Sequence, residues 1–474
     1  SKEMNRERAL LKNTIIIAIG TILPKMTTFI TLPVITASLT QIEYGTYDLI
    51  TTLVSFFLPM FTLQVQAAAF RFLIEYRGNK IKTKSVITNI LFFIIPVSIL
   101  SLFVLFFALY KLSIIIRLLI CIYFFVNILV LTARQIVRGL SNNLLYSISA
   151  VVESALNMIL VVGILKIADQ GIVGLLLSLT LATITGLLIL IIKGKIISNI
   201  DIKLLSKDLL KQILKYSWPL VPHVLSDWIL RLSDRLVITF FLGLNATAIY
   251  AVANKIPSLL ALIQTTFTYA WQENASLAAK DTDKDAYYTQ MFELMSRILS
   301  GGTALLIAAT PVLFKILIKG NYAEAYAQMP ILFLGTLFSV FASFIGGIYI
   351  AHKRTINMGL TTIAAAGVNL VLDLMLINYI GIYAASVSTL MSYFFLSLYR
   401  LCDIRKYHQI NVKVKNTLMY LSFLIAMCVM CWRQSFYLNI LNGLIGLVFA
   451  VVINHKLINN ILINILGKVK NKER

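Results

Sequence analysis

Long apolar runs separated by short polar segments fill almost the whole chain of 474 residues. Each run is close to the roughly 20 residues that an α-helix needs to cross a bilayer. Hydrophobic residues make up 59% of the sequence and charged residues only 13%, which is typical of a polytopic all-α membrane protein. The pattern predicts fourteen spans, at about 13–38, 46–70, 86–110, 114–133, 144–166, 172–192, 217–242, 246–272, 291–315, 328–350, 358–380, 382–401, 417–432 and 436–455.

Basic residues are distributed unevenly between the two sides of these predicted helices. Of 42 Lys and Arg, 32 fall on one side when residues at span ends are counted with the nearest loop, 6 fall on the other and 4 lie inside spans. Because cytoplasmic loops carry the excess of Lys and Arg, we expect both termini in the cytoplasm. Topology then accounts for most of the net charge of +22, and no nucleic-acid partner is expected. The N-terminus lacks a cleavable signal pattern.

A weak internal repeat divides the chain into two halves. Residues 39–47 and 242–250 match at Leu and Tyr with an offset of 203, and Gly171 and Gly381 open two spans with an offset of 210. Both pairs lie at outer loops, which predicts two parallel, pseudo-symmetric lobes of six helices. The predicted organisation is an N-terminal lobe (1–192), a basic amphipathic cytoplasmic linker (193–216), a C-terminal lobe (217–401), and two further helices with a basic tail (402–474). The linker could lie on the membrane surface or dock a partner.

The seventh predicted span carries four charges, Asp227, Arg231, Asp234 and Arg235. At helical spacing they fall within an arc of about 100° on one face. Charges at membrane depth are expensive and face a partner or a water-filled cavity. Two interpretations stay open and are compatible: an ion-pair ladder that holds helices together, and arginines that contact an anion such as phosphate.

Two lysines lie beside prolines inside predicted spans. Lys25 follows Pro24 near the middle of the first span, too far from either end to reach an interface easily, and Pro33 comes later in the same span. Lys255 precedes Pro257 in the eighth span. Since proline removes a helical hydrogen bond and favours a bend, these positions are candidates for a cavity wall and a gate.

Other candidates are weaker. Arg71 ends the second span and either contacts substrate or only marks topology. Glu153 and Asp373 are acids inside spans that could pair with a base or bind a coupling Na⁺ or H⁺. Pro219 and Pro222 open the seventh span and are further candidates for helix bending.

The sequence gives little sign of a cofactor or of an enzyme. It has no phosphate-binding loop motif, and its four histidines form no metal-binding pattern. Cys428 and Cys431 lie in an apolar helix without a second pair, so packing explains them better than a metal or redox role. The outer loops are short, which disfavours a membrane glycosyltransferase or polymerase. A coupling cation is the only small cofactor that we expect.

The segment 217–256 resembles the polysaccharide-repeat-unit flippases of the multidrug/oligosaccharidyl-lipid/polysaccharide exporter superfamily. The opening of the chain and the later segments 321–325 and 369–383 resemble the same family, although position 248 is Ala where the family more often has Gly. The residues that carry the likeness are Pro24, Lys25, Pro33, Glu43 to Tyr47, Pro219, Pro222, Ser233 to Arg235, Leu242, Gly243 and Tyr250 to Lys255.

The resemblance implies a V-shaped molecule with a central cavity, in the bacterial cytoplasmic membrane. Such flippases move an undecaprenyl-pyrophosphate-linked oligosaccharide to the outer leaflet by alternating access, for capsule, O-antigen or teichoic-acid export. It implies that Lys25, Arg235 and Lys255 face the pyrophosphate, with membrane lipids, a polysaccharide polymerase and other export proteins as partners. The alternatives are a cation-coupled multidrug antiporter, which would need an acid-dominated cavity, and a peptidoglycan lipid II flippase.

Overall fold

A computed structural model of the chain is all-helical in the part that it describes. It describes residues 2–168, 170–262, 278–352 and 354–459, with 264, 271, 275 and 463, and all side chains there except those of 2–15, 168, 223, 231 and 355. Ten described helices are long and apolar enough to cross a membrane, and one bent pair raises this number to eleven. The predicted all-α membrane fold is confirmed, and the count of fourteen spans stays a prediction.

The chain divides into two compact units, Ser1–Leu236 and Val237–Arg474. In the sequence, the boundary falls inside helix α9 (Leu220–Leu242), which is later than the predicted linker at 193–216. The predicted lobe limits, the V shape and a cavity between lobes stay predictions.

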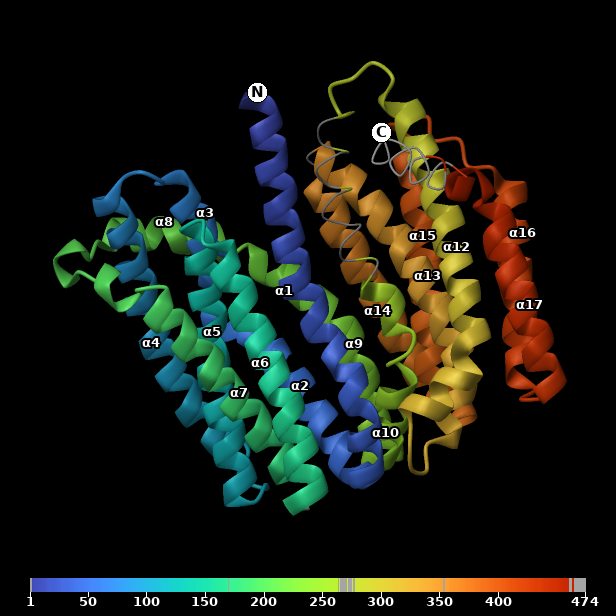
Figure 1. Cartoon of the computed structure of the whole chain (residues 1–474), viewed down its shortest axis with the longest axis horizontal. Coiled ribbons are helices and arrows are strands. Elements are labelled where there is room, and N and C mark those ends of the chain that lie inside the picture. Colours follow the sequence, from blue (N-terminus) through green and yellow to red (C-terminus); the bar gives the residue numbers. More distant parts are fainter. Residues whose placement is uncertain are drawn as a thin grey trace, which may run out of the picture. The chain divides into compact units, whose positions relative to one another are not determined.

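The first unit packs its helices around an apolar core to which α4 and α5 contribute fully buried Ile87, Ile90 and Ile136. Helix α6 lies against α1 and α7, and α5 lies against α3, α4 and α7 (Figure 1). At Gly20 of α1, a Cβ atom would meet the Ser147 backbone of α6 at 2.7 Å, so glycine permits their close approach. The helices up to the linker are α1 (Lys2–Ser38), α2 (Gln41–Thr62), α3 (Val65–Glu75), α4 (Lys80–Ala108), α5 (Ile114–Gly139), α6 (Asn143–Gly163) and α7 (Gly171–Lys193).

The predicted span 46–70 is broken into α2 and α3, which are bent by 56°. Helix α2 begins with a capping box between Thr40 and Glu43 and ends where Leu63 and Gln64 adopt left-handed backbone conformations, with φ of 47° and 57°. The Thr62 hydroxyl accepts a hydrogen bond from the Gln64 N–H at 3.3 Å. The Gln64 carbonyl accepts one from the Ala67 N–H at 2.9 Å. Hydrogen bonds within the segment 62–67 therefore stabilise the break.

The linker is not one amphipathic helix. It contains two short 3₁₀ turns, Ile197–Asn199 and Ile202–Leu204, before α8 (Lys207–Ser217). Helix α8 begins only there because the Ser206 hydroxyl caps the Leu209 N–H at 3.2 Å. Helix α8 packs on α3 and α4, and Ile213 is completely buried.

The second unit is centred on α13, which packs against α15, α12 and α10, while α15 also packs on α14 and α12 on α16 and α17. The second repeat pair lies at equivalent places: Gly171 and Gly381 have φ of 54° and 58°, Gly171 is the first residue of α7, and Gly381 lies two residues before α15. The helices are α10 (Leu244–Ala253), α12 (Lys284–Leu317), α13 (Ala323–Ala351), α14 (Thr355–Ile380), α15 (Tyr383–Ile404), α16 (Val414–Trp432) and α17 (Phe436–Ile453).

Candidate functional site

An ion pair joins α9 to α2 inside the first unit. The Arg235 Nε donates to Asp48 Oδ2 at 2.6 Å, and the two side chains are only 16% and 11% exposed. Tyr44, one turn before Asp48, is also buried. Sequence reasoning expected Arg235 to contact an anion or to take part in an ion-pair ladder that holds helices together, and it did not single out Asp48. The two partners are 187 positions apart, and the signal for Asp48 was an acid within a predicted span.

A second ion pair joins α5 to α6. Arg134 pairs with Glu153, and its Nε also donates to the Ser149 hydroxyl at 3.2 Å. The Thr183 hydroxyl donates to the other Glu153 oxygen at 3.0 Å. Sequence reasoning placed Arg134 in a cytoplasmic loop, whereas α5 continues to Gly139. The partner of Glu153 is thus an arginine that the predicted end of the span at 133 had excluded.

The charged residues predicted on one face of the seventh span are not equally exposed on α9. Asp227 is exposed, whereas Asp234 is buried. The side chain of Arg231 lies outside the described residues. Pro219 comes just before α9, and Pro222 is the third residue of α9. A backbone N–H at that position would have no acceptor within the helix, so proline removes no helical hydrogen bond there. These two prolines therefore open the helix, and a role in gating stays a prediction.

Two predicted cations lie on exposed faces of the first unit. Lys25 is exposed on α1 within the apolar stretch Ile16–Ser38, and Arg71 is exposed on α3. Helix α1 continues through both Pro24 and Pro33. Basic side chains on the surface of otherwise apolar helices are the kind that a water-filled path through a membrane requires.

Lys255 and Asp373 belong to the second unit. The predicted span 246–272 is interrupted, since α10 ends at Ala253 and a turn covers 254–257, where Pro257 has no N–H to donate. Lys255 is half-buried in that turn. Asp373 is completely buried on α14. Lys255 and Asp373 therefore belong to a different compact unit from Asp48 and Arg235.

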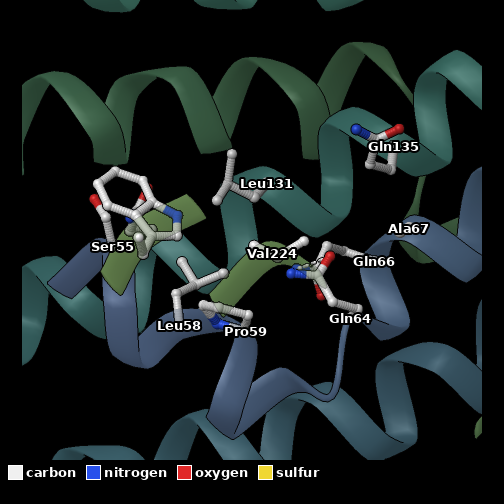
Figure 2. A pocket seen from close by; sticks show the side chains of 11 residues that line it. Ser55, Leu58, Pro59, Gln64, Gln66, Ala67, Leu131, Gln135 and Val224 are labelled. Carbon is white, nitrogen blue, oxygen red and sulfur yellow. Dashed lines mark hydrogen bonds between the residues drawn. The ribbon is translucent and has the colours of Figure 1, made fainter. Parts of the chain in front are cut away.

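A pocket of about 300 Å³ lies at the break between α2 and α3. Figure 2 shows Ser55 and Pro59 of α2 on one side of it, Gln64 and Gln66 at the break, and Gln135 of α5. The remaining lining residues are Leu58, Ala67, Asn127, Leu131, Val224 and Trp228. Sequence reasoning missed this pocket, although glutamines and an asparagine inside apolar spans were visible.

The helical fold is similar to those of solved membrane proteins, one of which belongs to the MOP superfamily. It is similar to an inward-facing multidrug resistance MATE family transporter of that superfamily, with a TM-score of 0.71 and 14% identity over 82% of this chain and 98% of the other. It is also similar to the lipid II flippase MurJ in an inward closed conformation, with a TM-score of 0.69 and 16% identity over 94% of this chain and 100% of the other.

The sequence assigns the family within that fold. The polysaccharide biosynthesis protein family matches residues 10–271, more than half of the chain, and the chain belongs to this family. It is also similar to an uncharacterized membrane protein of Methanocaldococcus jannaschii, with 26% identity over 206 residues, which are 42% of this chain. The match spans only 40% of the length of that curated relative. The resemblance drawn from the sequence motifs is confirmed.

Proposed function

We propose that the protein moves an undecaprenyl-pyrophosphate-linked oligosaccharide from the cytoplasmic to the outer leaflet of a bacterial cytoplasmic membrane, by alternating access. The observation that carries the proposal is Lys25, a lysine exposed in the middle of an apolar helix. Burying a pyrophosphate in hydrocarbon without compensation is prohibitive. A basic wall in a wet path offsets that penalty, and Arg71 on α3 adds a second cation in the same unit.

The two ion pairs argue against the multidrug antiporter. An antiporter for cationic drugs needs acids that attract its cargo, yet Asp48 and Glu153 are each held by an arginine. Arg235 could exchange its carboxylate partner for a phosphate, because a guanidinium suits both anions. Lys255 and Arg231 stay proposed cargo contacts. The assignment of a coupling Na⁺ or H⁺ to Asp227, Asp234 or Asp373 also stays a prediction.

A lipid II flippase is the second candidate, since its cargo has the same pyrophosphate chemistry and the fold is shared with MurJ. The family match favours a polysaccharide precursor instead. We further propose cytoplasmic termini and a polysaccharide polymerase among the partners of the export pathway.

Deleting the gene in its host and analysing lipid-linked intermediates by mass spectrometry tests the proposal. We expect a complete pyrophosphate-linked repeat unit to accumulate and surface polymer to disappear. Wild type and Lys25→Arg should restore export, and Lys25→Ala should not. Lys111→Ala, an exposed lysine in the loop after α4, is the control and should restore it. Accumulation of lipid II, or sensitivity to cationic dyes without any accumulation, would contradict the proposal.

A further inference from the structure

The pocket at the α2–α3 break has a chemistry that the cationic path does not explain. Its volume of about 300 Å³ lies at the lower end of the range for small-ligand sites, about 300–1,000 Å³. None of its eleven lining residues is Asp, Glu, Lys or Arg. The pocket is therefore suited to one uncharged ring-sized group and not to a pyrophosphate.

The polar lining consists mainly of side-chain amides. Gln64, Gln66, Asn127 and Gln135 each present both donors and an acceptor, and Ser55 adds a hydroxyl. Sugar hydroxyls also donate and accept, so amides match them in both directions. The indole of Trp228 and the apolar lining residues provide a surface for the less polar face of a sugar ring.

Gln66 gives an independent sign of a ligand site. Its side chain is buried, with 8% of the residue exposed, and its Oε1 has no hydrogen-bond partner among the described residues. Its Nε2 reaches Gln64 Oε1 only at 3.5 Å, which is long for a hydrogen bond. Buried acceptors are normally satisfied, and a ligand hydroxyl would satisfy this one.

The backbone conformation at the α2–α3 break also indicates a functional site. Leu63 and Gln64 have positive φ, a conformation that non-glycine residues adopt rarely and mostly at functional sites. Non-helical backbone at membrane depth is tolerated only inside protein or along a water-filled cavity. Broken helices in membrane transporters often form substrate sites for this reason.

The pocket and the Asp48–Arg235 pair lie at matched distances along two helices. Ser55 is seven residues after Asp48 on α2, and Trp228 is seven residues before Arg235 on α9. Seven residues of α-helix span about 10 Å. A charged contact and a neutral pocket thus follow one another along the same pair of helices, and a ligand that joins a pyrophosphate to a sugar would need both.

We propose that this pocket is a subsite for one uncharged sugar ring of the cargo, held by the amides of Gln64, Gln66, Asn127 and Gln135. The proposal rests on the proposed function, because it assumes a cargo that joins a pyrophosphate to a saccharide. It specifies which class of sugar binds in this pocket, namely a neutral sugar and not a uronic acid.

The test compares two synthetic probes on the purified full-length protein in nanodiscs. One probe is a polyprenyl pyrophosphate, and the other is the same molecule carrying a single glucose. Binding is measured for wild type, Gln66→Leu, Gln135→Leu and the control Gln290→Leu, an exposed glutamine on α12. Thermal unfolding of each variant shows whether it is folded, and Gln66→Leu should be, since its Oε1 has no partner to lose in the part of the chain that the structure describes.

We expect the glucose to tighten binding about tenfold in wild type and in Gln290→Leu, the gain from one or two well-placed hydrogen bonds. This gain should disappear in folded Gln66→Leu and Gln135→Leu, while the sugar-free probe binds all four proteins equally. If folded Gln66→Leu and Gln135→Leu both keep the full gain, the subsite is wrong and the proposed function stands. If neither probe binds wild type, the proposed function fails and the subsite with it.

Discussion

Helix α2 has a cavity on each of two faces, and their chemistry is opposite. The pocket beside Ser55 and Pro59 combines four side-chain amides, a hydroxyl and an indole with five apolar residues. The second cavity, about 480 Å³, is lined by Leu53, Phe57, Phe61 and nine further residues that are all hydrophobic. Asp48 and Ser55 share the polar face at a spacing of seven residues. Both cavities border the same apolar helix, so its mean hydropathy cannot distinguish them. The positions of a few polar side chains distinguish the candidate cargo path from ordinary apolar surface.

Breaking the Asp48–Arg235 ion pair should have the largest effect on stability. Asp48→Ala leaves Arg235 without its carboxylate in a mostly buried place, and we expect a loss of about 3–5 kcal/mol. Thermal or denaturant unfolding of the purified protein in detergent measures it.

The double variant Asp48→Leu with Arg235→Met is the control, because replacing a whole buried pair by apolar residues is often neutral. It should recover most of the stability without restoring export. A double variant as unstable as Asp48→Ala would show that the pair is not the source of the loss.

Removing the charge of Glu153 in the Arg134–Glu153 pair should have a smaller effect on stability. Glu153→Gln keeps the shape, and its one amide oxygen can still accept from Arg134 while its NH₂ group faces the Thr183 hydroxyl, so we expect a loss of about 1–3 kcal/mol. This pair lies on α5 and α6 and borders neither cavity, so export should persist where the variant is folded. Full loss of export in folded Glu153→Gln would place this pair in the transport path instead.

Filling the two cavities separates their roles with the least change in stability. Ser55→Phe projects into the polar pocket and should stop surface-polymer export, with a stability change below about 1 kcal/mol because a pocket of about 300 Å³ has room for the added ring. Leu53→Phe, on the apolar face of the same helix, is the matched control and should leave export intact. Surface polymer and unfolding are measured for both. Equal export by the two variants would remove the distinction between the two faces.

The sequence predicts the helices better than it predicts their polar contacts. Apolar periodicity and length located α17, observed at Phe436–Ile453 against a predicted 436–455, because a bilayer imposes one simple constraint. The break after Thr62 was missed since the polar residues there are uncharged and the run remains apolar on average. The partners of Arg235 and Glu153 could not be derived, because contacts between helices depend on packing that spacing along one helix does not encode. Lys25 was found because a lysine near the middle of an apolar span is conspicuous from the sequence alone.

Translocation by the purified protein in sealed proteoliposomes tests the central claim most directly. A fluorescent polyprenyl-pyrophosphate disaccharide is placed in both leaflets, and an impermeant quencher reports how much reaches the outer one. We expect rapid movement with wild type and Lys111→Ala, and background rates with Lys25→Ala. Background rates with wild type, together with uptake of a cationic dye, would contradict the account.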